Sequence, residues 1–500
     1  MNPTIDLESP SMLKKQNYPV STKMLIDGEL VASESGAELV STDPADESEL
    51  GRVPAATAAD VNRAVAAAER AQPEWARIGP VARGAYLRKL AAALRERADE
   101  VLELEVRDTG NTITKMAADV GQAADTMDYF AGLATELKGE TIPASSEHLH
   151  LTLREPYGVV GRIVPFNHPI KFAAHAISAP LIAGNTVVVK PPEQSPLSAA
   201  LLGELCRDIL PAGCVNILTG NGMPTGDAIV RHPSIKRIAF TGSVPTGRAI
   251  QMAAAESGVK NVTLELGGKN PLIAFPDMDP AKIAEVGLAG MNFSWQGQSC
   301  GSTSRLLLHE DIHDEVVERL LEAVARIRVG HPLDPASQMG PLNSRRHYER
   351  VQSMIAKGNE EGARLRFGGQ RPPGKEFERG YWLQPTVFSD VEAGMTLARE
   401  EIFGPVLSIF KWRTEEEAFD LANSTEYGLT ASIWTNDIKT AMRAVRRVKS
   451  GYIWVNGASG HFYGTPFGGM KSSGIGREEG LGELLSYTET KTVHFMGAFA

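Results

Sequence analysis

One cysteine lies in a setting that suits chemistry. Cys300 stands among small and polar residues in the stretch Asn292–Thr303 (NFSWQGQSCGST). A structural cysteine usually lies in an apolar run, where its thiol is inert. Serine and glycine leave backbone amides accessible, and such amides favour a thiolate and an oxyanion formed beside it. Cys300 is therefore a candidate nucleophile, and the alternative is an unreactive loop cysteine.

A candidate base lies upstream of this cysteine. Glu265 stands between Leu264 and Leu266, directly before the pair Gly267-Gly268. An apolar setting raises the pKa of a carboxyl group toward the range useful to a general base. The alternative is a salt bridge at a helix end. We expect no metal site, because the histidines have no ligand-like spacing with the cysteines, and the chain has no GxSxG motif.

A turn that could bind a phosphate occurs at Phe240–Arg248 (FTGSVPTGR), which closes a strand and opens a predicted helix. Ser243 suits the N-cap and Pro245 the first turn, so that free amides could face an anion. A plain strand-to-helix turn is the alternative. The glycine patterns at 220–226 and 474–480 each miss GxGxxG by one residue, and both could be only turns.

A cation and a carboxylate follow another predicted strand, in Val187–Pro196 (VVVKPPEQSP). Lys190 and Glu193 emerge there at the strand's carboxyl end, where a parallel sheet meets its ligand and a carboxylate can bind ribose hydroxyls. A surface salt bridge is the alternative.

The sequence predicts that these residues are positioned by a repeated series of strand, turn and helix. Short β-branched runs separated by helical lengths predict parallel βαβ units in a doubly wound sheet, which binds ligands at the carboxyl ends of its strands. These runs are 159–164, 186–189, 215–218 and 235–240. A second α/β region follows Cys300, with strands at 305–308, 433–434 and 452–455, a helix at 316–327 and a Gly- and Ser-rich loop at 457–480.

The N-terminal part supplies further elements. Asp27-Gly28 between two apolar runs predicts a β-hairpin, and leucines near a helical period predict helices over 59–108. Residues 148–154 alternate polar and apolar side chains, which predicts a strand. This strand could be an arm that pairs outside its domain, or part of an ordinary hairpin. The first twenty or so residues are polar and are expected to be a flexible lead-in.

Composition narrows the class of protein. A chain of 500 residues with 42% hydrophobic residues predicts two or three domains. A net charge of −10 argues against general affinity for nucleic acid or anionic membrane, and favours a small-molecule substrate. The three cysteines, the absence of a signal-like start and the lack of a long apolar run predict a soluble, cytoplasmic protein in a reducing compartment.

Seven segments in order resemble the aldehyde dehydrogenase superfamily, and the resemblance runs from about Met24 to the C-terminus. The segments are PFNHP at 165–169, KPPEQSP at 190–196, FTGS at 240–243, LELGGKNP at 264–271, GQSC at 297–300, EEIFGPV at 400–406 and PFGGMKSSGIGRE at 466–478.

The resemblance implies roles for individual residues. Cys300 matches the nucleophile, Glu265 the base that activates the deacylating water, and Asn167 the side-chain amide of the oxyanion hole, which the Cys300 backbone amide completes. Lys190 and Glu193 match residues that hold the adenosine ribose, and Gly242 and Ser243 the pyrophosphate turn. The remaining cofactor-binding residues implied are Glu401 and Phe403 at the nicotinamide ribose and ring, together with Phe166 and Gly267.

The implied chemistry is oxidation of an aldehyde through a cysteine thiohemiacetal and a thioester, with hydride passing to the nicotinamide. Glu265 favours hydrolysis of the thioester over transfer to coenzyme A. Glu193 favours NAD, because a carboxylate would repel a 2′-phosphate, although NADP stays possible. The alternatives are a coenzyme A-acylating semialdehyde dehydrogenase and a non-catalytic NAD-binding protein of the same fold.

The sequence departs from the family pattern where the substrate tunnel is expected. We expect a roomy, partly polar tunnel for an aromatic or carboxylate-bearing aldehyde; the alternative is that these side chains face away from it. The tunnel residues expected are His168, Lys171, His175, Trp295, Gly301, His461, Phe462 and Phe467.

The resemblance also implies a three-part α/β fold. The parts are a Rossmann-like dinucleotide-binding domain (20–138 and 158–269), an α/β catalytic domain (270–480) and a small β oligomerisation arm (139–157 and 481–500). Residues 486–493 are expected to form a strand that pairs across subunits, giving a homodimer or homotetramer.

Overall fold

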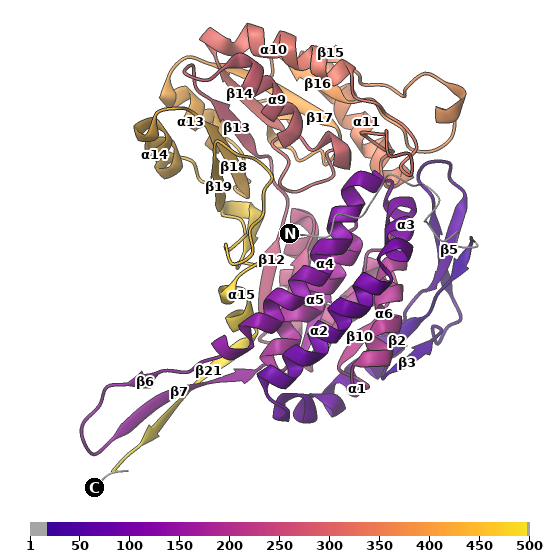
Figure 1. Ribbon diagram of the computed structural model, residues 1–500, viewed down its shortest axis with the longest axis vertical. Helices are drawn as coiled ribbons and strands as arrows, with labels where there is room; N and C mark the ends of the chain where they lie inside the picture. Colours follow the sequence, from indigo (N-terminus) through magenta and orange to yellow (C-terminus); the bar gives the residue numbers. More distant parts are fainter. Residues whose placement is uncertain (1–17, 498–500) are drawn as a thin grey trace.

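The computed structural model describes residues 18–497. The predicted N-terminal lead-in therefore lies almost wholly outside the described residues. Figure 1 shows two α/β bodies, each built around its own sheet, and a long β arm that extends away from them. The predicted fold class, two α/β regions with a small β arm, is confirmed.

The first sheet has eight strands in the order β20-β12-β11-β8-β9-β10-β2-β3. Its five central strands are parallel, as the β-branched runs predict. The predicted hairpin at Asp27-Gly28 is confirmed, because Met24 pairs with Val31. The strands are β2 (Met24–Ile26), β3 (Glu29–Val31), β8 (Val159–Ile163), β9 (Thr186–Lys190), β10 (Val215–Ile217), β11 (Ile235–Thr241), β12 (Asn261–Glu265) and β20 (Gly474–Ile475).

Helices cover both faces of this sheet because its strands are apolar on both sides. In β9, Val187 and Val189 pack into one core and Val188 into the other, as alternate residues of a strand must. The first core includes α2 (Pro80–Glu96), α3 (Ala98–Thr109), α4 (Ile113–Gly132), α5 (Pro169–Ala183) and α6 (Leu197–Ile209). The second includes α1 (Ala58–Arg77), α7 (Asp227–Arg231) and α8 (Val244–Ser257).

The second sheet has seven strands in the order β15-β16-β17-β14-β13-β18-β19, and all but the edge strand β15 run parallel. The strands are β13 (Pro271–Ala274), β14 (Arg305–His309), β15 (Arg364–Phe367), β16 (Thr386–Ser389), β17 (Val406–Trp412), β18 (Thr430–Trp434) and β19 (Tyr452–Val455). One face packs on α9 (Pro280–Gly290) and α10 (Glu310–Ala325). The other packs on α11 (Arg345–Glu360), α12 (Thr396–Arg399), α13 (Glu415–Asn423) and α14 (Ile438–Arg447).

The arm is a three-stranded antiparallel sheet in the order β21-β7-β6. Its strands are β6 (Thr141–Ile142), β7 (Leu149–Pro156) and β21 (Thr488–Phe495). Residues 148–154 thus fall largely in β7, and β21 pairs with β7 of the same chain over eight residues. The strand expected at 486–493 is observed as β21, and its partner, β7, belongs to the same chain. Pairing across subunits stays a prediction for the outer edge of β21.

A short strand from the second half of the chain completes the first sheet. In β20, Gly474 pairs with Glu265 and Ile475 with Leu264 of β12. This part of the predicted catalytic range 270–480 therefore belongs to the first sheet, because the chain crosses back after β19. The predicted domain boundaries otherwise stay predictions.

The remaining elements are short. A small sheet in the order β1-β5-β4 consists of β1 (Val20–Ser21), β5 (Glu49–Pro54) and β4 (Glu38–Thr42). The short helices are η2 (Leu133–Glu136), η3 (Gly222–Gly226), η4 (Phe293–Trp295), η5 (Lys375–Phe377), η6 (Lys471–Ser473) and α15 (Leu481–Ser486). Among residues 18–497, no helix combines the length and apolar character that crossing a bilayer requires.

Candidate active site

A cavity of about 500 Å³ opens at the carboxyl ends of β8, β9, β11 and β12. The chain runs from β8 outward to β9 and β10 and then returns to β11 on the other side of β8. The strand order reverses there, which is where open α/β sheets bind nucleotides. Every residue expected to bind cofactor lines this cavity: Phe166, Lys190, Glu193, Gly242, Ser243, Gly267, Glu401 and Phe403.

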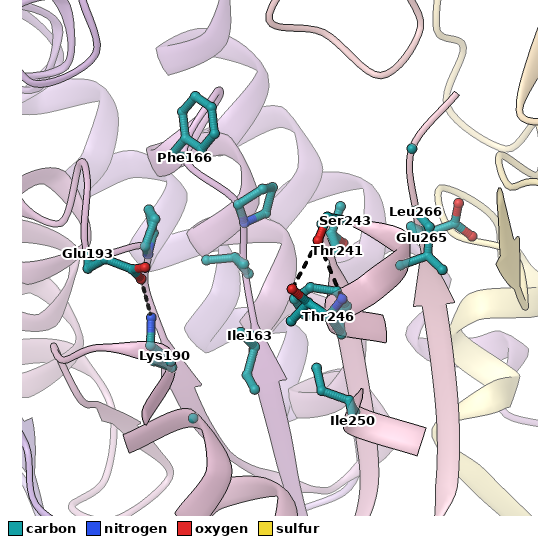
Figure 2. A pocket seen from close by; sticks show the side chains of 18 of the residues that line it. Ile163, Phe166, Lys190, Glu193, Thr241, Ser243, Thr246, Ile250, Glu265 and Leu266 are labelled. Atoms are coloured by element: carbon teal, nitrogen blue, oxygen red, sulfur yellow. Dashed lines mark hydrogen bonds and ion pairs between the residues drawn. The ribbon is translucent and has the colours of Figure 1, made fainter. Parts of the chain in front are cut away.

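Lys190 and Glu193 form an ion pair at one side of the cavity (Figure 2). The Lys190 Nζ donates to Glu193 Oε2 at 3.0 Å and to the Pro191 carbonyl at 2.9 Å. Burial lowers the pKa of Lys190, while the facing carboxylate of Glu193 raises it in part. The Lys190 side chain is buried and that of Glu193 is partly exposed, so a ribose in the cavity could donate to the carboxylate and accept from the ammonium.

The turn after β11 is built as predicted. The Ser243 side chain caps α8 by accepting from the Thr246 amide at 3.4 Å, and a proline stands in the first turn of that helix. Figure 2 shows Ser243 and Thr246 side by side at the end of β11. The first turn of α8 therefore offers backbone amides toward the cavity.

The two glycine patterns, at 220–226 and 474–480, differ in their position relative to the cavity. Gly222, Met223 and Gly226, from the first pattern, line the cavity. The second pattern is absent from its lining and instead supplies β20 and the turn after it.

Glu401 also lines the cavity. Its Oε1 accepts from the Gly268 amide at 2.9 Å, and burial raises its pKa to about 7. A methyl group at Gly267 would come within 2.0 Å of Glu401 Oε2, so the absence of a side chain there makes room for this carboxyl. Among the described residues, the hydrogen bond to this carboxyl therefore comes from the backbone.

Aromatic rings complete that wall. Phe403 and Phe166 lie edge to face at 5.7 Å, and His347 packs against both. The His347 Nε2 donates to the Phe403 carbonyl at 2.6 Å, and burial lowers the pKa of the ring to about 4. A neutral imidazole therefore fixes the position of Phe403, whose φ of 57° is left-handed. Nothing in the spacing around His347 signals this role.

Cys300 lines the same cavity at the end of a tightly turned loop. Asn292 and Gln296 have left-handed φ angles of 56° and 52°, and the Asn270 side-chain amide donates to the Cys300 carbonyl at 2.7 Å. Burial, together with the carboxylates of Glu401 and Glu265, raises the pKa of the thiol to about 12. The sequence predicts a setting that favours a thiolate, whereas burial and these carboxylates favour the thiol.

Glu265 ends β12 and also lines the cavity. Both of its carboxyl oxygens are buried without a hydrogen-bond partner among the described residues. Burial raises the pKa of this carboxyl well above its usual value, and Glu478 raises it further. In Figure 2 the side chain extends toward the C-terminal segment, where Gly468 gives it room. A buried, unpaired carboxyl of raised pKa has the properties of a general base, and a salt bridge is absent within residues 18–497.

Asn167 lies between β8 and α5 and lines the cavity beside these two residues. Its carbonyl accepts from the Asn111 side chain at 3.0 Å, while its side-chain amide makes no hydrogen bond within the part of the chain that the structure describes. Nucleophile, base and amide donor, predicted from separate segments, are therefore brought to one cavity.

The expected tunnel residues do not line this cavity. His168 contacts Asp119 at 2.5 Å and packs on Trp295, with ring centroids 4.5 Å apart. Phe462 is 62% exposed. A methyl group added at Gly301 would lie 4.0 Å from the Trp454 ring.

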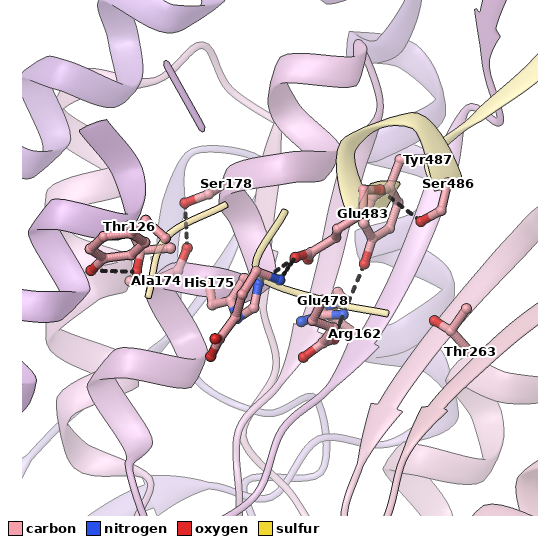
Figure 3. Close-up of polar contacts among 12 residues, drawn as sticks. Thr126, Arg162, Ala174, His175, Ser178, Thr263, Glu478, Glu483, Ser486 and Tyr487 are labelled. Carbon is pink, nitrogen blue, oxygen red and sulfur yellow. Dashed lines mark hydrogen bonds and ion pairs between the residues drawn. The ribbon is translucent and has the colours of Figure 1, made fainter. Parts of the chain in front are cut away.

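His175 does not fit a tunnel wall. It is buried in α5, with its Nε2 2.8 Å from Glu483 Oε2. Nearly all of α5 is buried, so the His175 ring is satisfied by Glu483 inside the protein (Figure 3) and not by a substrate.

Sequence reasoning missed three polar residues, namely Lys269, Asp119 and Glu479. Lys269 is buried with no hydrogen bond to its Nζ from any described residue, and burial lowers its pKa to about 7. Asp119 and Glu479 each hold a histidine of the predicted tunnel. A charged residue in an apolar stretch signals Lys269, but no local pattern signals the other two.

The fold and the site together define a class of protein. It is an α/β protein with two sheets, and a cysteine lines the cavity at the position where a parallel sheet binds nucleotides. The model of the aldehyde dehydrogenase family matches residues 30–493. The aldehyde dehydrogenase tropH of Talaromyces stipitatus is 44% identical over 96% of this chain and 94% of its own.

Solved structures agree with this match. A putative aldehyde dehydrogenase from Burkholderia cenocepacia is 40% identical, with a TM-score of 0.93 over 95% of this chain and 97% of that one. The NAD⁺ complex of an aldehyde dehydrogenase from Bacillus cereus is 38% identical, with a TM-score of 0.92 and the same coverage. The chain belongs to the aldehyde dehydrogenase family, whose members are oxidoreductases.

Proposed function

We propose that the protein oxidises an aldehyde to its carboxylic acid with NAD, through a covalent adduct on Cys300. One observation carries the proposal: a single cavity joins the Lys190–Glu193 pair and the capped turn at Ser243 to Cys300, Asn167 and Glu265. The cavity fits a dinucleotide, because it offers a ribose-binding ion pair, helix amides for phosphate and a carboxyl held beside Gly267.

The chain's own residues carry the carbon chemistry. After the Cys300 thiol has lost its proton to water, its sulfur adds to the aldehyde carbon and forms a thiohemiacetal. The Asn167 amide and the Cys300 backbone N–H donate to the oxyanion that develops. A bound nicotinamide would supply the hydride acceptor and a positive charge. Loss of hydride from the adduct leaves a thioester on Cys300.

Glu265 then takes a proton from the water that attacks the thioester carbon, and the acid and the free thiol are released. The unpaired, high-pKa carboxyl suits this role, and it favours hydrolysis over transfer to coenzyme A. Glu193 favours NAD over NADP, because its carboxylate would repel a 2′-phosphate.

The expected substrate is an aromatic or carboxylate-bearing aldehyde, because the family resemblance places His168, Lys171, His461 and Phe467 at the substrate tunnel. A cytoplasmic homodimer or homotetramer is part of the same proposal, with the outer edge of β21 as the subunit contact.

A direct test is to incubate the purified protein with NAD or NADP and a panel of aliphatic, aromatic, amino and acidic aldehydes, with and without coenzyme A. Absorbance at the reduced nicotinamide and mass analysis of the product are both read. Acid formation that is independent of coenzyme A and lost in Cys300→Ala supports the proposal. An acyl-coenzyme A product supports the acylating rival, and NAD binding without turnover supports the non-catalytic one.

A further inference from the structure

The β arm carries a pair of histidines outside the candidate active site. His150 of β7 and His494 of β21 are directly opposite each other in the antiparallel register. Their rings meet at 83° with centroids 4.6 Å apart, and the two Nδ1 atoms are 2.8 Å apart. Figure 1 shows both strands in the arm, which extends away from the two α/β bodies. The two residues are 344 positions apart in the sequence, so their spacing along the chain gives no sign of a metal site.

The pair lies on the polar face of the arm. Alternate residues of a strand point to the same face, so the leucines of β7 are on the opposite face from His150. The next pair along the face of the histidines is Thr152 and Thr492, whose side chains are short. His494 is exposed and His150 is half-buried. The edges of both imidazole rings are therefore within reach of ions and water.

One hydrogen bond joins the two rings. The Nδ1 of one ring donates and the Nδ1 of the other accepts, because a hydrogen bond needs one proton between the two nitrogens. No residue in 18–497 is hydrogen-bonded to the Nε2 of either ring, so each Nε2 is free to carry a proton. His148 lies on the same face, but its Nδ1 accepts from the Gly497 amide at 2.9 Å. His148 is therefore occupied, whereas the paired nitrogens share a single proton.

The separation of the two nitrogens suits a transition-metal ion. Such an ion binds imidazole nitrogen at about 2.0–2.1 Å, so nitrogens 2.8 Å apart subtend about 85–90° at the metal. Neighbouring ligands in the square-planar or tetragonal sites of Cu²⁺ and Ni²⁺ have this angle, and both ions favour imidazole. No group of three or more His, Cys, Asp or Glu side chains in residues 18–497 could hold a metal ion, so the protein supplies two ligands here.

We propose that His150 and His494 form a site for a divalent transition-metal ion, Ni²⁺ or Cu²⁺ by its geometry, with water completing the coordination. Each Nδ1 gives its lone pair to the metal. The proton on the donating Nδ1 passes through water to Nε2 of the same ring, so both rings stay neutral and no net proton is released. The metal joins β21 to β7 and fastens the C-terminal strand of the arm. The proposal goes beyond the proposed function and does not depend on it.

The test measures Ni²⁺ binding by the full chain after treatment with EDTA, with Cys300→Ala present in every sample so that this thiol cannot bind the metal. Isothermal titration calorimetry is expected to find one equivalent of Ni²⁺ per chain that His150→Asn and His494→Asn each lose. His148→Gln, on the same face of β7, is the matched control and should keep this equivalent. Mg²⁺ should not bind at the pair, because it prefers oxygen ligands.

Two further measurements test the ligands and the effect on the arm. The electron paramagnetic resonance spectrum of one equivalent of Cu²⁺ should show coupling to two nitrogens in the parent protein, which needs no variant that could misfold. Ni²⁺ should slow amide hydrogen exchange in β7 and β21 of the parent protein but not in His150→Asn or His494→Asn. Without metal, the arm amides of these variants should exchange as in the parent protein, which shows that the arm is intact.

The contrary results are equally clear. Equal Ni²⁺ binding by the parent protein and both variants, or no Ni²⁺ binding at all, overturns the inference. Loss of the equivalent in His148→Gln, or a Cu²⁺ spectrum without two coupled nitrogens, would also contradict a site made by the pair. None of these results bears on aldehyde oxidation, which is measured separately in protein that retains Cys300.

Discussion

Replacing the Glu265 carboxyl with an amide separates the two halves of the proposed reaction. Glu265→Gln keeps the side chain's size but cannot accept a proton from water. Formation of the thioester and release of hydride need only Cys300, its oxyanion donors and the cofactor, so the first turnover should persist. Hydrolysis of the thioester should become rate-limiting.

The size of the effect follows from the setting of the carboxyl. A positioned general base contributes about 10²–10⁴-fold, so kcat is expected to fall by that factor, which corresponds to about 3–5 kcal/mol. Burial raises the pKa of Glu265 well above its usual value, so at a pH below this pKa only a small fraction of the enzyme has the deprotonated base. In that pH range the deacylation rate of the wild type should rise about tenfold per pH unit. The deacylation rate of Glu265→Gln should not show this pH dependence.

The assay is a stopped-flow measurement of reduced nicotinamide, followed to the steady state. A burst of one equivalent per active subunit, followed by a slow phase, is expected for Glu265→Gln. Mass analysis of the quenched protein should then show the acyl group on Cys300. If the burst rate falls as far as kcat, Glu265 acts before hydride release and the assigned role is refuted.

Three further predictions concern the cavity. Asn167→Ala should lower kcat about 10²–10³-fold in steady-state assays with little change in NAD affinity, since the lost donor faces the oxyanion. Gly267→Ala places a methyl 2.0 Å from Glu401 Oε2, and the resulting overpacking of about 1–3 kcal/mol should appear as a raised KM for NAD. Glu193→Gln should raise kcat/KM with NADP relative to NAD about tenfold or more, because a like charge is removed from the ribose site. An unchanged NADP-to-NAD ratio would mean that Glu193 does not select the cofactor.

Local sequence patterns predicted the parts of the site that lie at strand ends. The Ser243 cap follows from residue types a few positions apart, and the parallel sheet then brings distant strand ends to one edge. The convergence of Cys300, Glu265 and Asn167 could be expected only through the family resemblance, because their segments lie in different parts of the chain.

The polar partners of the expected tunnel residues could not be predicted this way. His175 and Glu483 are 308 residues apart, and His168 and Asp119 are 49 apart. Helix periodicity cannot tell which face of α5 meets the substrate, because almost every residue of that helix is buried. The electrostatic setting of Cys300 also lies beyond local patterns, because Glu401 and Glu265, which raise the pKa of its thiol, come from segments that only the family resemblance brings together.

The strand β20 carries a consequence for how the protein is made. The outer edge of β12 is covered by β20, residues 474–475. The ribosome adds these residues more than two hundred positions after it has completed β12. Until then β12 is an unpaired edge, which is a template for association with other chains. Assembly of the first body therefore waits for nearly the last part of the polypeptide, and shielding that edge during synthesis should decide how much protein escapes aggregation.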